Sequence, residues 1–96
     1  MIIEILRFRL AAGADEGAFL EADKRIQTEF AYRQPGMVRR TTAKGGDGEW
    51  VVIDLWYSQA DADRCEIVWG KDPVTAEFIK FVDKASIKTE RFETLD

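Results

Sequence analysis

The stretch VVIDLWYSQADAD, residues 51–63, decides how this chain is interpreted. Side chains alternate between the two faces of an extended strand, so the spacing predicts a strand over 49–57. Both faces are mostly apolar, which favours a strand that is covered on both sides. One face carries Trp50, Val52, Asp54 and Trp56, and the other carries Val51, Ile53, Leu55 and Tyr57.

The second half of the stretch begins a helix. Ser58 is followed three residues later by Asp61, which resembles a capping box, and Gly70 ends the helix. Asp72 and Pro73 then restart a helix as its cap and first residue. The apolar spacing predicts that this helix continues to residue 85, through Val74, Phe78, Phe81, Val82 and Ala85.

The remaining elements surround this junction. Strands are predicted over 2–10, 37–44 and 87–95, and Asp15 caps a helix that QPG at 34–36 stops. The segment GGDG at 45–48 lies between two strands, which indicates a hairpin turn rather than a phosphate loop. The order is β-α-β-β-α-β. It predicts one α+β domain over 1–96, ferredoxin-like, with a four-stranded antiparallel sheet and helices on one face.

The sheet face without helices should carry apolar side chains, because both faces of the first and third strands are apolar. Such a patch is too large for a comfortable monomer. Two sheets packed face to face would cover it, so we expect a twofold homodimer.

Composition excludes several classes of protein. The net charge of −4 and the pI of about 4.9 leave no basic face for nucleic acid, and Arg39 and Arg40 are interpreted as solvated strand ends. No apolar run reaches the roughly 20 residues of a membrane span, and the first residues lack the features of a signal peptide. A single cysteine, Cys65, suits a reducing compartment, so a cytoplasmic protein is expected.

Three segments together resemble a known family. They are DLWYSQADADR at 54–64, PGM at 35–37 and FIKFVDKASIKTERFETL at 78–95. They are similar to the dimeric α/β-barrel superfamily and, within it, to antibiotic-biosynthesis-monooxygenase-like domains, whose strand Trp and helix cap match Trp56 and Ser58. The resemblance implies a dimer that binds a small aromatic compound, with cofactor-independent oxidation of quinols or anthrones as one activity and haem degradation as another.

Two departures count against a direct transfer of either activity. The oxygenases place an asparagine where this chain has Val52, and the haem-handling members use a histidine, which this chain lacks entirely. Of the family's site residues, only the strand tryptophan is carried over, to Trp56.

Asp54 is the sharpest catalytic candidate. On an enclosed strand face, desolvation would raise its pKa, and the carboxylate could take a proton from a phenolic or enolic substrate, with Arg7 or Arg9 stabilising the anion. The alternative is an ion pair with Arg7, Arg9 or another strand arginine, within the chain or across a dimer interface, since buried charges are usually paired.

Aromatic residues could line a pocket for a flat ligand. Trp56, Trp69 and Tyr32, with Phe78 and Phe81, are the candidates, and plain core packing is the alternative for each. Cys65 is interpreted as a small buried hydrophobe.

Metal and cofactor sites are not expected. Without histidine, zinc and other transition-metal sites are improbable, and a Ser-His-Asp system is impossible. Asp61, Asp63 and Glu66 could hold a cation, but acids in the first turns of a helix are favoured by its dipole anyway. The sequence therefore predicts a cofactor-free small-molecule-binding protein. It is either a monooxygenase-like enzyme that acts on a small aromatic, quinol or polyketide-like substrate, or a non-enzymatic binding or dimeric assembly module.

Overall fold

The computed structural model describes all 96 residues, Met1–Asp96. None of its helices has the length and apolar character needed to cross a membrane. The elements are, in chain order, β1 (Ile2–Arg9), α1 (Glu16–Glu29), the 3-10 turn η1 (Ala31–Arg33), β2 (Met37–Lys44), β3 (Glu49–Trp56), α2 (Gln59–Val68), α3 (Pro73–Ile79), the 3-10 turn η2 (Lys84–Ser86) and β4 (Lys88–Glu93).

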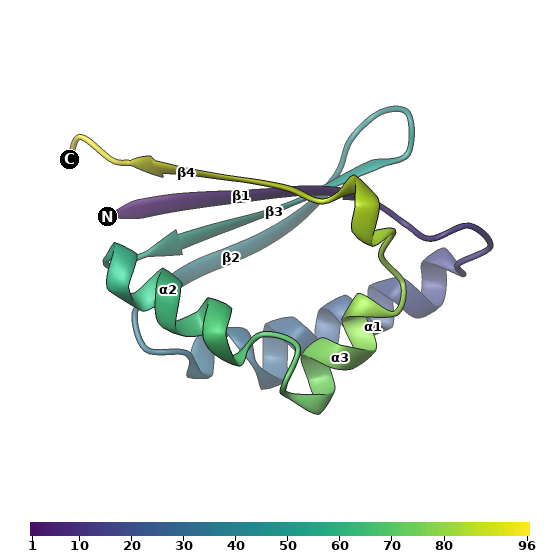
Figure 1. The fold of residues 1–96 in the computed structure, drawn as a ribbon, viewed down its shortest axis with the longest axis horizontal. Helices are drawn as coiled ribbons and strands as arrows, with labels where there is room; N and C mark the ends of the chain where they lie inside the picture. Colours follow the sequence, from purple (N-terminus) through teal and green to yellow (C-terminus); the bar gives the residue numbers. More distant parts are fainter.

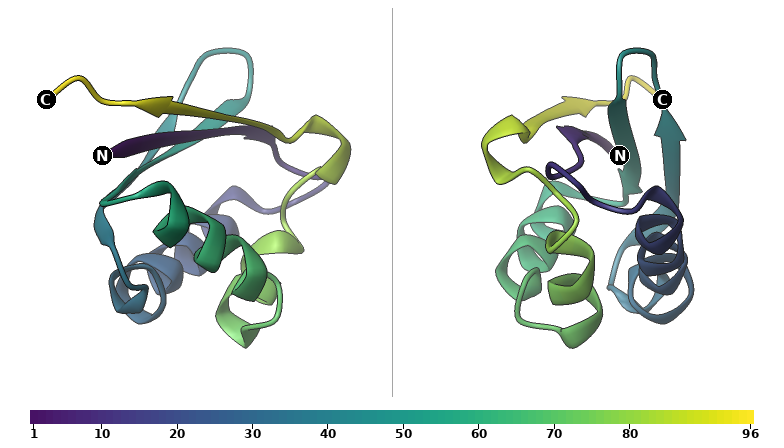
Figure 2. Two further views of the ribbon diagram at one scale, coloured as in Figure 1. Left: turned by 60° about the vertical axis from the view of Figure 1, so that its left-hand side comes forward. Right: turned by 90° about the vertical axis from the view of Figure 1, so that its right-hand side faces the viewer.

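The four strands form one sheet in the order β2-β3-β1-β4, and every neighbouring pair is antiparallel. All three helices lie against one face of this sheet, and the other face carries no helix (Figures 1 and 2). The predicted ferredoxin-like α+β fold is confirmed, with its second helical region divided into α2 and α3 near Gly70, where φ is +86°.

Each helix begins where the local sequence supplies a cap. Asp15 accepts a hydrogen bond from the backbone N–H of Ala18, and Ser58 accepts one from that of Asp61. Asp72 caps α3 in the same way, with Pro73 as the first helical residue. These caps satisfy backbone donors that a helix start leaves free, so the three predicted start points are confirmed.

The structure decides which face of β3 meets the helices. Trp50, Val52 and Trp56 are buried on the helix side, whereas Ile53 is 39% exposed on the other side. The core beneath the sheet is aromatic: the ring centroid of Phe19 lies 5.0 Å from that of Trp50 and 5.3 Å from that of Phe78. Asp54 shares this enclosed face.

The prediction of a helix through residue 85 is wrong. Helix α3 ends at Ile79, and the next residues pair with the end of β1 instead. The backbone N–H of Ala11 donates to the carbonyl oxygen of Phe81, and that of Asp83 donates to the carbonyl oxygen of Arg9. These tertiary hydrogen bonds replace the helical ones, although the apolar spacing would have allowed the helix to continue.

Candidate functional site

A cavity of about 270 Å³ lies between the sheet and the helices. Its walls are mainly apolar and come from all four strands and all three helices. Its exposed lining residues are Glu66 on α2, Ile87 and Thr89, so the mouth lies between α2 and β4. The interior is lined by Leu6, Ile26, Phe30, Val52, Asp54, Phe78 and Val82, among others.

Asp54 projects into this cavity from β3. Its Oδ1 atom is buried and has no hydrogen-bond partner. Buried polar atoms without partners are rare in folded proteins, so the Asp54 carboxyl is a candidate for contact with a ligand or water. Burial raises the pKa of the Asp54 carboxyl from 3.8 to about 7, with the charge of Arg40 opposing the rise and that of Glu4 adding to it. A carboxyl of this kind can exchange a proton near neutral pH.

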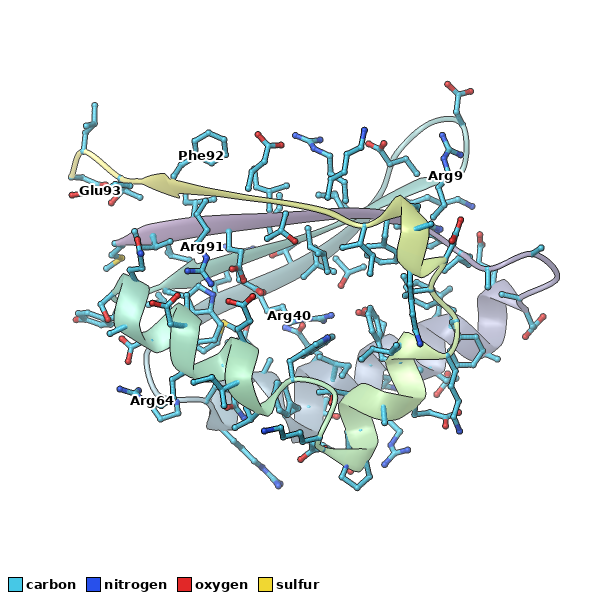
Figure 3. The ribbon with its side chains drawn as sticks, viewed as in Figure 1. Arg9, Arg40, Arg64, Arg91, Phe92 and Glu93 are labelled. Atoms are coloured by element: carbon cyan, nitrogen blue, oxygen red, sulfur yellow. The ribbon has the colours of Figure 1, made fainter.

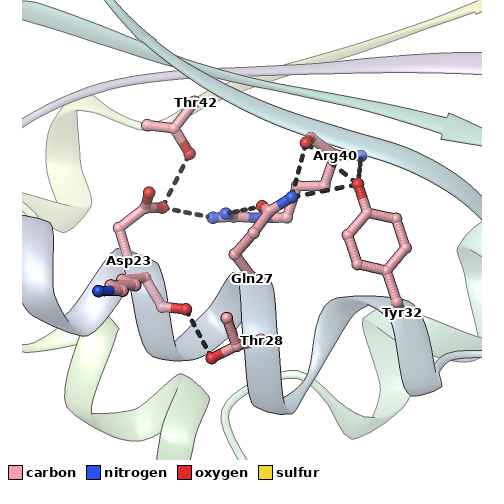
Figure 4. Close-up of polar contacts among 7 residues, drawn as sticks. Asp23, Gln27, Thr28, Tyr32, Arg40 and Thr42 are labelled. Atoms are coloured by element: carbon pink, nitrogen blue, oxygen red, sulfur yellow. Dashed lines mark hydrogen bonds and ion pairs between the residues drawn. The ribbon is translucent and has the colours of Figure 1, made fainter.

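Arg40 is the arginine nearest to Asp54 in the sheet, since the two are directly opposite in the β2–β3 register. It is only 5% exposed. Its guanidinium donates to Asp23 Oδ1 at 2.8 Å and to Gln27 Oε1 at 3.0 Å, both on α1 (Figure 4). The interpretation of Arg40 as a solvated strand end is therefore wrong. Helix α1 covers this end of β2 and encloses a positive charge beside the cavity.

A second arginine, Arg91, lies on the other side of the cavity. It projects from β4 toward α2, beneath the sheet, whereas Phe92 projects the opposite way (Figure 3). Arg91 Nε donates to Glu4 Oε2 at 2.7 Å, and its terminal nitrogens bind Asp63 and Glu66 of α2. The hydrogen bonds to Asp63 and Glu4 raise the pKa of the Arg91 guanidinium far above its usual range. The ion pairs tie β4 to α2 at the cavity mouth.

Cys65 also lines the cavity. Burial, with the charges of Asp54 and Glu4 adding to it, raises the pKa of its thiol to about 12. A thiol in such surroundings stays protonated and is a weak nucleophile. This agrees with its interpretation as a small hydrophobe.

The aromatic candidates are distributed unevenly. Trp69 lines the cavity and its ring packs against those of Phe30 and Phe78, with centroids 5.7 and 5.8 Å away. Trp56 is 1% exposed and packs against Ala62 and Ile2 in the core, outside the cavity lining. Its indole Nε1 is, like Asp54 Oδ1, buried without a partner.

Tyr32 lies outside the cavity lining. Its side chain is directed at β2, where the hydroxyl accepts a hydrogen bond from the Arg40 backbone N–H at 3.0 Å (Figure 4). Gln27 Nε2 also donates to this hydroxyl. Tyr32 therefore supports the strand segment that carries Arg40.

Arg7 and Arg9 are not brought to Asp54. Both lie on the open face of β1. Arg7 pairs with Glu90 at 3.4 Å, and Arg9 donates a hydrogen bond to the carbonyl oxygen of Asp47. Both line a separate hollow with Ser86 and other residues. Within one chain, Arg40 is the lining residue whose positive charge could stabilise an anion in the cavity.

The acids of α2 have partners in the chain. Asp61 accepts from Ser58 and Arg64, and Asp63 and Glu66 accept from Arg91. No group of three or more His, Cys, Asp or Glu side chains is arranged to hold a metal ion.

Sequence reasoning missed three residues of this site: Glu4, Arg40 and Arg91. A usable signal was present for Glu4, which shares the strand face of Leu6 and Phe8, an enclosed face. No local signal distinguishes Arg40 from Arg39, or Arg91 from Lys88. Their placement depends on a strand register that the local pattern does not reveal.

No family model and no curated protein sequence matches the chain. Among solved structures, SnoaB, a cofactor-independent oxygenase from Streptomyces nogalater, matches with a TM-score of 0.79 and 21% identity over 99% of this chain and 93% of its own. The chain has the fold of an antibiotic-biosynthesis-monooxygenase-like domain.

Two further structures share this monooxygenase-like fold. A candidate antibiotic biosynthesis monooxygenase from Nitrosomonas europaea matches with a TM-score of 0.72 and 18% identity over the whole of both chains. Rv0793 from Mycobacterium tuberculosis matches with a TM-score of 0.69 and 16% identity over 99% of this chain and 95% of its own. The resemblance noted in the sequence is confirmed at the level of the fold. One fold hosts many activities, so the site has to supply the argument for function.

Proposed function

We propose that this protein binds a small planar phenol or enol in the Asp54 cavity and oxidises it with dioxygen, without a bound cofactor. The main support for this proposal is the Asp54 carboxyl, which lines the cavity and has an oxygen without a hydrogen-bond partner. Asp54 is the base that takes the hydroxyl proton of the substrate. Arg40, rather than Arg7 or Arg9, supplies the positive charge that favours the resulting anion.

The acidity of Asp54 suits this role. With its pKa at about 7, the carboxyl is largely ionised in mildly alkaline solution and is a stronger base than an ordinary aspartate. A simple phenol has a pKa of about 10, so the remaining gap is about three pH units. Charge stabilisation by Arg40 and conjugation in the substrate would reduce that gap.

The cavity limits the size of the substrate. A cavity of about 150 Å³ holds one benzene molecule, and ligand sites commonly range from about 300 to 1,000 Å³. The 270 Å³ found here suits one or two fused rings. The helices supply an apolar floor through Ile26, Phe30 and Phe78, and the polar groups lie toward the sheet and the mouth. A flat ring with one polar edge fits this division.

The reaction needs no added reductant. After Asp54 takes the hydroxyl proton of the enol tautomer, the electron pair of the delocalised anion forms a bond to dioxygen from the conjugated CH carbon, which is the CH₂ carbon of the keto tautomer. The terminal peroxide oxygen takes the proton back from Asp54. Cleavage of the O–O bond with loss of the remaining hydrogen on that carbon leaves a carbonyl and one water. One dioxygen is consumed for each CH₂ that becomes C=O.

The fold neighbours support this class of reaction, since SnoaB is a cofactor-independent oxygenase. The resemblance implies an asparagine where this chain has Val52, which lines the cavity without a polar atom. We propose that Asp54, two residues further along the same strand face, makes the polar contact with the substrate in place of that asparagine.

The open face of the sheet supports a further part of the proposal, a homodimer in which two such faces pack together. Its centre is apolar and exposed or half-buried, through Ile3, Ile5, Val51, Ile53, Leu55 and Phe92. A patch of this kind on a small domain favours a partner surface of the same character. We place the dimer in the cytoplasm because the single cysteine, Cys65, is a free thiol.

Ligand binding is tested first. Tryptophan fluorescence is measured during titration with one- and two-ring phenols, quinols and benzylic ketones, with correction for ligand absorbance. Trp69 is the tryptophan that lines the cavity, so saturable quenching should be lost in Trp69→Phe and kept in Trp56→Phe. Flat titrations across the panel would overturn the proposed substrate class and favour a dimeric assembly module.

Turnover is tested with any ligand that binds. We expect oxygen uptake of one dioxygen per product, and a loss of roughly 100-fold or more in kcat for Asp54→Asn. Asp47→Asn is the matched control, because Asp47 lies in the exposed β2–β3 turn at positive φ, which asparagine also adopts. Unchanged turnover in Asp54→Asn would refute the role of Asp54. Binding without oxygen uptake would identify a non-enzymatic ligand binder.

A further inference from the structure

Four charged residues form a continuous row across the enclosed face of the sheet. In the strand register, Arg40 is opposite Asp54, Asp54 is opposite Glu4, and Glu4 is opposite Arg91. Residues directly opposite in neighbouring antiparallel strands have Cβ atoms about 5 Å apart. The row therefore places two carboxylates side by side in the middle, with one arginine at each end.

The two carboxylates in this row differ in their partners. Glu4 accepts a 2.7 Å hydrogen bond from Arg91 Nε, whereas Asp54 Oδ1 accepts none. Arg40 makes no direct hydrogen bond to Asp54: its terminal nitrogens donate to Asp23 and Gln27. Glu4 is thus held in an ion pair, whereas the Asp54 carboxyl has an unpartnered oxygen.

Arg91, the partner of Glu4, is itself held from more than one direction. Its remaining nitrogens bind Asp63 and Glu66 on α2, so the guanidinium is held between the sheet and the helix. The side chains of Arg91 and Glu4 are 24% and 18% exposed, which limits screening of this pair by water. The Glu4 carboxylate consequently has a defined position, fixed relative to β1, β4 and α2.

A fixed negative charge beside a second carboxyl disfavours ionisation of that carboxyl. The charged and titratable groups around Asp54 are Arg40 from β2, Glu4 from β1, and Cys65 and Glu66 from α2. Arg40 favours the charged form of Asp54, and Glu4 disfavours it. Cys65 stays neutral, and the Glu66 carboxylate binds Arg91 in an exposed position. Burial is the main cause of the raised pKa of Asp54, and among the charged groups it is Glu4 that opposes Arg40.

We propose that Glu4 is a positioning residue for Asp54: its ion pair with Arg91 holds the Glu4 carboxylate opposite Asp54, where its negative charge helps Asp54 to hold a proton. This inference deepens the proposed function, since it concerns the same cavity and the same proton. A base that takes a proton from the substrate and returns it to a peroxide must hold that proton in between. Without Glu4, Arg40 would make Asp54 a more acidic group and a poorer proton carrier.

The test is a carboxyl ¹³C NMR titration of the ligand-free protein from about pH 4 to pH 9. The Asp54 resonance is identified by its loss in Asp54→Asn. In the unmodified protein its midpoint is expected near 7. Glu4→Gln removes the charge at nearly constant shape and should lower that midpoint by about one pH unit. Glu4→Asp keeps the charge and should keep the midpoint much closer to that of the unmodified protein.

Glu90→Gln is the matched control. Glu90 also pairs with an arginine, Arg7, but on the open face of the sheet. Its removal should leave the Asp54 midpoint unchanged. If Glu4→Gln is too unstable to titrate, Glu4→Gln/Arg91→Gln removes both charges, and the midpoint should fall as well, because Arg91 lies one strand further from Asp54. An unaltered midpoint, or an equal change in Glu90→Gln, would overturn the inference.

This titration needs no substrate, so the two proposals can fail separately. A lowered midpoint in a protein that oxidises nothing would uphold the role of Glu4 and refute the oxygenase proposal. If turnover depends on Asp54 but the Asp54 midpoint does not change in Glu4→Gln, the oxygenase proposal is upheld and the role of Glu4 is refuted.

Discussion

In most proteins apolar residues are buried and charged residues are exposed, and each face of this sheet departs from that rule in its own way. The face beneath the helices encloses charged residues, including Arg40 and Asp54, beside an apolar cavity. The open face leaves apolar residues in solvent, with Ile53 39% and Phe92 49% exposed. Enclosed charges cost desolvation free energy, and exposed apolar area forgoes the free energy of burial.

This difference indicates two separate functions for the faces. Charge kept in an enclosed space is useful for holding a ligand or moving a proton, because electrostatic interactions are stronger there than in water. Apolar area kept in the open is useful for association. Changes to the enclosed charged residues should therefore alter stability, and changes to the exposed apolar residues should alter self-association.

The largest expected effect concerns Asp54 and pH. Its pKa is raised from 3.8 to about 7 on folding, so between these values the folded state binds more protons than the unfolded state. Stability therefore falls as pH rises through this window, by up to about 4 kcal/mol, since each pH unit is worth about 1.4 kcal/mol. Asp54→Asn removes this loss. It should approach the unmodified protein in stability near pH 4 and exceed it by about 2–4 kcal/mol near pH 8.

Urea denaturation of both proteins across this pH range measures the difference. Because all other groups are common to the two proteins, the difference isolates Asp54. A constant difference from about pH 4 to pH 8 would mean that Asp54 is not desolvated as the enclosed face requires.

A somewhat smaller effect is expected from Arg40→Met. The side chains of Arg40 and Asp23 are 3% and 15% exposed, so the change leaves Asp23 charged and nearly buried. Such unpaired charges cost about 3 kcal/mol of stability. Lys44→Met is the matched control on the same strand, since Lys44 pairs with Glu16 of the same helix in an exposed position. It should cost less than about 1 kcal/mol. Equal costs by thermal or urea denaturation would show that burial does not distinguish the two pairs.

The smallest effect concerns the open face. Ile53→Asp puts a charge at the centre of the apolar patch and should weaken self-association by at least about tenfold, roughly 1.4 kcal/mol. Sedimentation velocity over a range of concentrations measures this. Leu20→Asp is the control, because Leu20 is similarly exposed on α1, away from the sheet. An unmodified protein that remains monomeric at every concentration would contradict the homodimer.

The site shows where sequence reasoning succeeded and where it stopped. Alternation along β3 put Asp54, Val52 and Trp56 on one face, and the structure keeps them together. The same reasoning assigned Arg7 and Arg9 to Asp54, although they lie on the other face of β1. Glu4, on the correct face of β1, was passed over. Alternation groups residues within one strand, but it does not say which face of a neighbouring strand joins them.

What the sequence determined by itself is local. Caps at Asp15, Ser58 and Asp72 depend on hydrogen bonds across two or three residues, and strand and helix periodicity depend on neighbours along the chain. These local signals were enough for the element order and the ferredoxin-like fold. They could not predict that α3 ends at Ile79, because this end depends on hydrogen bonds to the end of β1, some seventy residues earlier in the chain.

Only the tertiary structure decided the rest. With both faces of β3 apolar, helix packing selected the enclosed face and so gave Asp54 its cavity and its raised pKa. Strand register then aligned Arg40, Glu4 and Arg91 with it, from positions up to 87 residues apart in the chain. Electrostatic interactions act through space. A proton affinity set by three strands therefore exists only once those strands are paired.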